Sequence, residues 1–394
     1  MIVDGQLGPE YEQIRHPTFS PDGEHLACMV KKDQRWSVVV DGQPGPQIDW
    51  IMYGIVFSAD SRHVAYGAQK DNKEVIVIDG QPGPQRDIDL EGQPVLSRDG
   101  QRLAYATWTD KGLIVVSDGH TGPVFDEIAR GSIVFSPDSR RLAYTALKDK
   151  KWSVVVDGRP GEEEALVKLY VEFMFCRPVF SPDSRHIAYG AKKGHGVTVV
   201  LDDQPGPQFD DLADNSLTFS PDSKRVAYAA RRGKNWMVVL DGQVGPECDR
   251  IGFGCPVFSP DSKHFAYWAK KDGRAMVIVD GQPGPHFDGI TEGSLVFSPD
   301  SMRLAYGARR IAQSHLVING QLGPGYDSIG TPVFSPDGMH VAHTVVRGRR
   351  FLMVVDGQPG PTYDDILCGL AVTNDGFRML AERSRVFYRL SWKP

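Results

Sequence analysis

The sequence lacks the features that mark a membrane protein, a disulfide scaffold or a disordered tail. Its 394 residues contain only five cysteines, and no apolar run reaches the roughly 18 residues that a membrane-spanning helix needs. There is no long block of like charge and no low-complexity tract, and 41% of the residues are hydrophobic. These absences favour a folded globular chain that does not insert into a membrane.

Short motifs with a known catalytic mechanism are also missing. The sequence has no GxSxG, P-loop, HExxH or CxxC motif, and no Ser, His and Asp set stands apart from the rest. We therefore expect no enzymatic activity, no catalytic residue, no metal site and no cofactor.

The few cysteines carry a hypothesis about the compartment. Cys28 occupies a position where related segments have Tyr, so we interpret it as a small buried hydrophobe. An odd count at unpaired positions predicts free thiols in a reducing compartment. The N-terminus MIVDGQLGP has no secretory signal. We expect a cytoplasmic protein, and the alternative is an exported protein whose leader has been removed.

What the sequence does contain is one repeated unit. A regular copy reads VFSPDSRRLAYTA at 134–146 and WSVVVDG at 152–158, and its Phe slot recurs at spacings of 37 to 45 residues. This period suits four short strands per unit. The ten units span about 18–51, 56–90, 95–128, 134–170, 179–212, 218–251, 257–290, 296–329, 333–366, and 371–392 together with 2–14.

Within a unit, four segments have strand character, which we name A, B, C and D. Examples are 178–181 for A, 186–191 for B, 197–201 for C and 209–212 for D. An SPDS or SPDG turn joins A to B, and DGQPGP is interpreted as a wide loop between C and D. Such a sheet is apolar on both faces and must stack on its neighbours.

The ends of the chain predict how the array closes. The last unit has no strand D, and Tyr11–Ile14 near the N-terminus matches that missing strand. We therefore predict an all-β fold, a β-propeller of about ten four-stranded antiparallel blades in a single domain over 1–394. The N- and C-terminal strands should pair in one blade. A nine-bladed ring and two smaller rings remain alternatives.

The SPD turn followed by a hydrophobic-Ala-Tyr strand resembles the repeats of TolB-like (WD40-like) β-propellers. The copies depart from the pattern at SAD (58–60), SRD (97–99) and TND (373–375). The resemblance implies propeller architecture and frequent partner binding, with activity only where extra domains or central residues supply it. It does not identify a partner.

Basic residues gather in the segments between strands B and C. These segments hold 24 of the 44 Lys and Arg residues and six acids, so they carry +18 while the rest of the chain carries −24. Such a face could steer an anionic partner, although Lys and Arg are also ordinary hairpin-tip residues. The other irregular feature is the aromatic segment 161–176 between strands D and A.

The sequence predicts a monomeric, non-enzymatic scaffold that binds a macromolecular partner through its B–C and D–A loops. This partner is a protein or another macromolecule, and anionic macromolecules are among the candidates. The alternatives are a small-ligand binder or enzyme that uses a central channel, and a purely structural repeat protein. The partner-binding candidates are Lys31, Lys32, Lys150, Lys151, Arg231, Arg232, Lys270, Lys271, Arg309, Arg310, Arg349, Arg350, Trp50, Tyr53, Tyr170 and Phe173.

Overall fold

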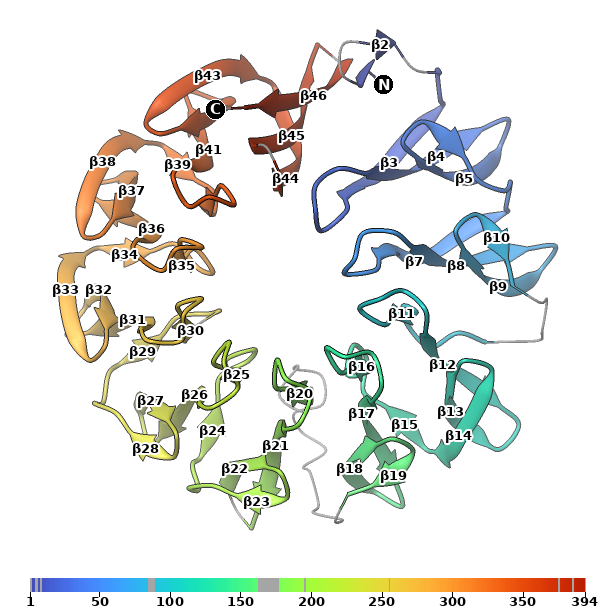
Figure 1. Cartoon of the computed structure of the whole chain (residues 1–394), viewed down its shortest axis with the longest axis horizontal. Helices are drawn as coiled ribbons and strands as arrows, with labels where there is room; N and C mark the ends of the chain where they lie inside the picture. Colours follow the sequence, from blue (N-terminus) through green and yellow to red (C-terminus); the bar gives the residue numbers. More distant parts are fainter. Residues whose placement is uncertain are drawn as a thin grey trace. The chain divides into compact units, whose positions relative to one another are not determined.

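A computed structural model describes residues 2–3, 6–7, 9–83, 89–161, 177–194, 196–254, 256–374, 376–384 and 386–393. These residues form β-strands and turns and contain no helix, so none of them belongs to a helix that could cross a bilayer. The strands make ten small sheets, and the fold is the predicted ten-bladed β-propeller (Figure 1). We number the blades 1 to 10 by their strand B.

Strands B and C form the centre of every blade. The first five residues of strand B are buried in most blades because neighbouring blades cover both faces of the sheet. The B strands are β4 (Leu26–Lys32), β8 (Val64–Lys70), β12 (Leu103–Thr109), β17 (Leu142–Lys148), β21 (Ile187–Lys193), β26 (Val226–Arg232), β31 (Phe265–Lys271), β36 (Leu304–Arg310), β41 (Val341–Arg347) and β45 (Gly376–Arg383). The C strands are β5 (Arg35–Val40), β9 (Lys73–Ile78), β13 (Gly112–Ser117), β18 (Lys151–Val156), β22 (Gly196–Leu201), β27 (Asn235–Leu240), β32 (Arg274–Val279), β37 (Gln313–Ile318), β42 (Arg350–Val355) and β46 (Val386–Trp392).

The turn between strands C and D is tight, and the predicted wide loop is wrong. In blade 1 the two turn residues, Asp41 and Gly42, have φ of +48° and +80°. Two positive φ values in a two-residue turn match the twist of the flanking strands. Gln and Pro of DGQPGP then begin strand D, because proline is tolerated where the strand is the edge of a sheet. The D strands are β6 (Gln43–Pro44), β10 (Gln81–Pro82), β14 (His120–Phe125), β19 (Arg159–Pro160), β23 (Gln204–Pro205), β28 (Gln243–Val244), β33 (Gln282–Phe287), β38 (Gln321–Tyr326) and β43 (Gln358–Tyr363).

The segment predicted as strand D crosses between two blades instead. Phe209 bridges Val197 in strand C of blade 5, whereas Leu212 pairs with Ala230 in strand B of blade 6. This crossing segment is therefore the first part of the next strand A. Strand A is continuous in β3 (Gln13–Phe19), β7 (Trp50–Phe57) and β44 (Asp365–Thr373). Elsewhere it consists of β11 (Val95–Leu96), β15 (Glu127–Ile128) with β16 (Val134–Phe135), β20 (Val179–Phe180), β24 (Asp211–Leu212) with β25 (Thr218–Phe219), β29 (Arg250–Ile251) with β30 (Val257–Phe258), β34 (Gly289–Ile290) with β35 (Val296–Phe297), and β39 (Ser328–Ile329) with β40 (Val333–Phe334).

The termini pair in one blade, as predicted, but through other residues. Ile2 of β1 (Ile2–Val3) pairs in parallel with Tyr388 of β46, and β2 (Gln6–Leu7) pairs with β1. Tyr11–Ile14 does not supply this strand. Ile14 lies in β3 and pairs with Val30 of blade 1. Tyr11–Ile14 corresponds to the crossing segment 209–212, and such a segment pairs with strand B of the blade that follows it.

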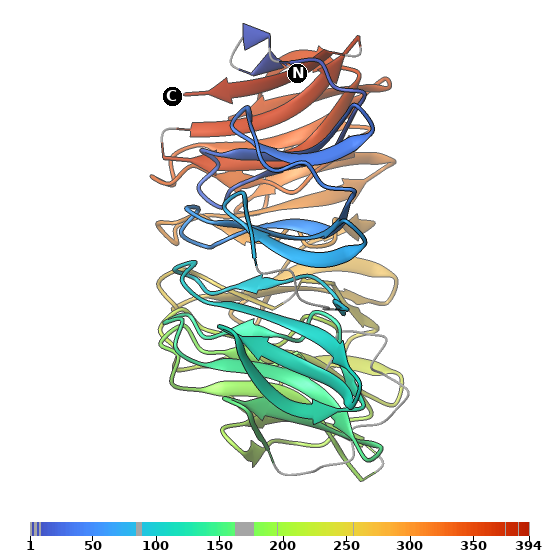
Figure 2. The ribbon, with the colours of Figure 1, turned by 90° about the vertical axis from the view of Figure 1, so that its right-hand side faces the viewer.

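Contacts divide the chain into two compact units of five blades. The N-terminal unit comprises 8–193 and 199–205, and the C-terminal unit comprises 1–7, 194–198 and 206–394. In the N-terminal unit the sheets follow one another as a stack, which Figure 2 shows from the side. Apolar side chains fill the space between successive blades, as Val38 of blade 1 and Tyr66 of blade 2 do. The single domain over 1–394 stays a prediction.

Candidate partner-binding surface

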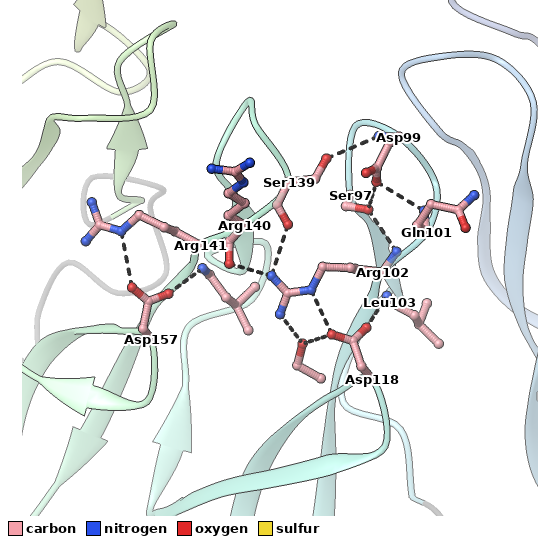
Figure 3. A network of polar contacts seen from close by, with 12 residues as sticks. Ser97, Asp99, Gln101, Arg102, Leu103, Asp118, Ser139, Arg140, Arg141 and Asp157 are labelled. Atoms are coloured by element: carbon pink, nitrogen blue, oxygen red, sulfur yellow. Dashed lines mark hydrogen bonds and ion pairs between the residues drawn. The ribbon is translucent and has the colours of Figure 1, made fainter.

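Adjacent blades are joined through their SPD-type turns. In blade 3 the Ser97 hydroxyl donates to the Asp99 carboxylate at 2.6 Å, and the Asp99 amide donates to Ser139 Oγ of blade 4 at 3.3 Å (Figure 3). The hydrogen bonds to this carboxylate, led by that of Ser97, hold the pKa of Asp99 below its usual range. The same link recurs at Asp22, Asp138, Asp222 and Asp261. Repetition makes these aspartates structural, as the sequence predicted.

A second polar contact recurs at the start of strand B. Arg102 Nε donates to Asp118 at 2.7 Å, and Arg102 Nη1 donates to the backbone carbonyls of Ser139 and Arg140 (Figure 3). Histidine takes the place of arginine in other blades, with Nδ1 between 2.5 and 2.8 Å from the carboxylate. These pairs are His25–Asp41, His63–Asp79, His186–Asp202, His264–Asp280 and His340–Asp356. The histidines are thus a polar repeat position.

The described residues include no group of His, Cys, Asp and Glu side chains that could hold a metal ion. Cys28 and Cys248 are buried free thiols, and burial raises the pKa of Cys28 to about 12 and that of Cys248 to about 11. Burial of this kind makes a thiol inert. Cys176 and Cys255 and the side chain of Cys368 lie outside the described residues.

The basic candidates lie at the B–C turns. Carboxylates that the charge count from the sequence placed outside these turns lie beside them. The aspartate of a crossing segment accepts a hydrogen bond from the next B–C turn. Asp49 accepts the Asp71 amide at 2.7 Å, and Asp249 accepts the Asp272 amide at 2.8 Å. The same bond is made by Asp126, Asp210, Asp288, Asp327 and Asp364. The charge at these turns is therefore more balanced than +18 suggests.

Several of the basic candidates are engaged by neighbouring side chains. Arg231 pairs with Asp211 at 2.9 Å, and Arg350 pairs with Asp364. Arg232 lies over the Phe209 ring at 5.2 Å. Lys32, Lys150, Lys151, Arg232, Lys271, Arg309, Arg310, Arg349 and Arg350 are exposed, whereas Lys31, Arg231 and Lys270 are half-buried.

Trp50 lies at the start of a different surface, in the N-terminal unit. Its side chain is 50% exposed, and the centre of its ring lies 5.6 Å from that of the buried Trp36 ring in an edge-to-face arrangement. The guanidinium carbon of Arg15 lies 5.2 Å from the centre of the Trp36 ring. The buried tryptophan thus holds an exposed tryptophan in a fixed orientation beside a cation.

Tyr53 continues this surface from blade 2 to blade 3. The register of β7 against β8 shifts between Met52 and Val56, and Tyr53 has φ of +59°. A bulge of this kind re-aims a side chain, and here the ring is 38% exposed. The Tyr53 hydroxyl donates to the Leu90 carbonyl at 2.8 Å, which fixes the ring against the next blade.

Trp108, Glu91 and Arg130 complete the surface on blades 3 and 4. Trp108 is 41% exposed, and its Nε1 donates to Glu91 at 3.2 Å. The other carboxylate oxygen of Glu91 accepts Arg130 Nε at 2.8 Å. The hydrogen bond and charge of Glu91 raise the pKa of Arg130 above its usual value. We name Arg15, Trp50, Tyr53, Glu91, Trp108 and Arg130, together with the buried Trp36 that contacts Trp50, the aromatic–arginine surface.

Sequence reasoning found Trp50 and Tyr53 and missed the other members. Trp108 could have been found, because it stands in a strand B slot that holds Lys31, Arg231 or Lys270 in other units. The contact of Glu91 with Arg130 could not have been predicted from the sequence, because it joins side chains from two different blades. The candidates Tyr170 and Phe173 lie outside the described residues.

Comparison with protein-family models and with curated proteins gave no match. Solved structures do match, at low identity. A eukaryotic initiation factor structure is 14% identical, covers 91% of this chain and 90% of its own, and has a TM-score of 0.49. TolB from Acinetobacter baumannii is 13% identical over 68% and 77% of the two chains with a TM-score of 0.30, and the Dos1 propeller is 14% identical over 75% and 89% with 0.38. The propeller fold rests on the ten sheets of this chain itself, and these likenesses carry no argument about its function.

Proposed function

We propose that this chain is a non-enzymatic scaffold that binds a protein partner through the aromatic–arginine surface of its N-terminal unit. The observation that carries the proposal is the set of exposed Trp, Tyr and Arg side chains that contacts between blades hold in place. Trp, Tyr and Arg are the residues that dominate the energetics of protein interfaces.

Rigidity is what distinguishes this surface from scattered exposed apolar residues. The Trp50 ring packs against the Trp36 ring. The Tyr53 hydroxyl donates a hydrogen bond to the Leu90 carbonyl, and Trp108 Nε1 donates one to Glu91. Side chains ordered before binding lose less conformational entropy when the partner arrives. In blade 3 the polar side chains of Ser97, Asp99, Arg102 and Asp118 are committed to the repeated contacts between strands and blades.

The test is a comparison of variants in partner capture from native extract, followed by affinity measurement with the captured protein. Trp50→Ala and Trp108→Ala should each weaken binding by at least about tenfold, as loss of an interface anchor does. Phe253→Ala is the matched control, because Phe253 is 53% exposed in the C-terminal unit and lies outside the surface. Equal affinity for the three variants and the parent chain would contradict the proposal.

A second candidate function, binding of a polyanion, is favoured by one observation in the C-terminal unit. Lys270, Lys271, Arg309, Arg310 and Arg349 form no ion pair with any residue that the structure describes. Binding to heparin should fall steeply with salt if these cations matter, because counterions are released. Reversal of Lys270, Lys271, Arg309 and Arg310 to Glu should abolish it. No detectable binding to heparin at about 50 mM salt, where contacts to a polyanion are strong, would exclude this function.

A further inference from the structure

The turn between strands C and D of blade 8 contains the single Asn-Gly pair of the sequence, Asn319–Gly320. Both residues are exposed, and both have positive φ, +48° for Asn319 and +79° for Gly320. In an Asn-Gly pair the backbone nitrogen of the glycine can attack the side-chain amide carbon of the asparagine, because no Cβ shields that nitrogen. This reaction converts the asparagine to an aspartate, so the question is what an aspartate does at this position.

An aspartate at this position completes an ion pair that eight other blades have. In blades 1 to 7 and in blade 9 the corresponding turn residue is Asp, and its carboxylate pairs with the His or Arg at the start of strand B. In blade 8 the residue at the start of strand B is Arg303. Asn319 Oδ1 accepts the Leu304 amide at 2.8 Å, as an Asp241 oxygen accepts the Val226 amide in blade 6. Blade 8 therefore keeps the backbone contact and lacks the negative charge.

The Arg303 guanidinium already has the surroundings that arginine has in the complete pairs. Its carbon lies 5.0 Å from the centre of the Phe334 ring of the next blade, as that of Arg102 lies 5.0 Å from Phe135. In the complete pairs Nε donates to the carboxylate, at 2.7 Å for Arg102 and 2.9 Å for Arg225. Within the part of the chain that the structure describes, the Arg303 guanidinium forms no ion pair and donates no hydrogen bond.

The hydrogen bonds of this turn favour attack on the Asn319 side chain. The Leu304 N–H polarises the Cγ–Oδ1 bond and stabilises the negative charge that gathers on Oδ1 when a nucleophile adds to Cγ. Among the described residues Nδ2, the leaving group, donates only to the Met302 carbonyl, at 3.4 Å. The Gly320 N–H donates no hydrogen bond to a described residue, so solvent can remove its proton. Apart from its chain neighbours, the nearest atom to the point where a Cβ of Gly320 would stand is 3.9 Å away.

We propose that Asn319 is a deamidation site and that the aspartate formed there pairs with Arg303. The Gly320 nitrogen forms a bond to Cγ, the Cγ–Nδ2 bond breaks, and ammonia leaves with the proton of the Gly320 N–H. Water then adds to Cγ of the cyclic imide, the new N–C bond breaks, and the nitrogen regains a proton. One water is consumed and one ammonia is released, without oxidation or reduction. Because the Leu304 N–H polarises the Cγ carbonyl, water opens the imide at Cγ and the ordinary backbone returns. The inference does not depend on the proposed partner surface.

The experiment incubates the full chain in warm, mildly alkaline buffer and follows its proteolytic peptides by mass spectrometry. The Asn319 peptide should gain the mass difference between an amide and an acid, at least about tenfold faster than the peptide with Asn235, which precedes the bulky Trp236. Chromatography beside the same peptide from the Asn319→Asp variant separates aspartate from isoaspartate, whose backbone runs through the side-chain carbon. The NMR signal of the Arg303 Nε–H in the incubated chain should shift to its position in Asn319→Asp.

The matched variant is Gly320→Asp, because blade 5 has Asp202 and Asp203 in the same turn with φ of +46° and +63°. The turn tolerates this side chain, which shields the attacking nitrogen, so conversion of Asn319 should slow by at least about tenfold. A thermal melt checks that the variant is folded. The proposal is overturned by the absence of conversion in the parent chain, by equal rates at the two asparagines or in the two chains, by isoaspartate as the main product, or by an unchanged Arg303 signal.

Discussion

Blade 3 keeps the ion pair of the repeat and blade 4 keeps its buried tyrosine, whereas blade 8 departs from the first of these features and blade 9 from the second. Arg102 pairs with Asp118 in blade 3, but blade 8 has Asn319 in place of that aspartate, and Asn319 accepts the Leu304 amide. Blade 4 buries Tyr144 in strand B, but blade 9 buries His343, which is 2% exposed and whose two ring nitrogens have no hydrogen-bond partner among the described residues. The strand pairing in blade 8 is nevertheless the same as in blade 3.

This difference teaches that the polar contacts add stability to a blade whose form is already set by apolar stacking. Ala305 and Leu316 of blade 8 pack in one cluster with Val341 and Val345 of blade 9, despite both departures. A blade can therefore lose a polar contact of the repeat and keep its place in the fold. The positions that depart are then available for other uses.

The largest expected effect comes from giving strand B of blade 4 the histidine that blade 9 has at the same position. Tyr144→His should lower the free energy of unfolding by about 3 kcal/mol, because it leaves a void and buries unpaired ring nitrogens. Tyr144→Phe should change it by less than about 1 kcal/mol, since the Tyr144 hydroxyl has no hydrogen-bond partner in the part of the chain that the structure describes. Urea denaturation measures both. Equal effects of the two substitutions would show that blades 4 and 9 do not differ at this position.

The reverse substitution in blade 9, His343→Tyr, should remove a pH dependence of the free energy of unfolding. Burial lowers the pKa of His343 from 6.5 to about 4. Between these values the unfolded chain binds a proton that the folded chain does not, so stability falls as pH falls below 6.5. His343→Tyr should abolish this loss, which amounts to about 2 kcal/mol between pH 7.5 and pH 5. The measurement is the difference in unfolding free energy between variant and parent at the two values, and a constant difference would contradict the prediction.

Exchanging the paired residues of blades 3 and 8 should give effects of opposite sign. Asp118→Asn removes the carboxylate from Arg102 and should cost about 1 kcal/mol. Asn319→Asp supplies one to Arg303 and should stabilise by up to about 1 kcal/mol. Both substitutions keep the oxygen that accepts the backbone amide. Chemical denaturation at low salt checks the signs, and two effects of the same sign would refute the comparison.

The smallest effect concerns the link between SPD-type turns. Ser139 accepts the Asp99 amide and has φ of +64°, whereas blade 9 has Gly338 at the corresponding position with φ of +70°. Ser139→Ala should cost about 1 kcal/mol through the lost hydrogen bond. Ser139→Gly should cost less, because glycine adopts a positive φ without strain. Thermal unfolding of the two variants gives the order, and a more stable Ala variant would reverse it.

The sequence predicted the repeat and the number of blades, since every unit carries the same alternation of strand and turn. It also predicted that the repeated Asp22 and Asp41 are structural. It placed strand D wrongly because proline and glycine in DGQPGP suggested a loop. An edge strand needs few backbone donors on its outer side, so QPGP can form one, and Tyr11–Ile14 was assigned to the wrong blade for the same reason.

The sequence by itself determined the fold class, because a unit that cannot bury both faces of its own sheet must stack on copies of itself. It also contained, unrecognised, the single exchange of Asp for Asn319. Only the tertiary structure decided which side chains meet. Trp36 and Trp50, Glu91 and Arg130, and Arg303 and Phe334 come from different strands or blades. Their contacts depend on the crossing segments and on the bulge at Tyr53, which re-aims a side chain in a way that a period of two does not predict.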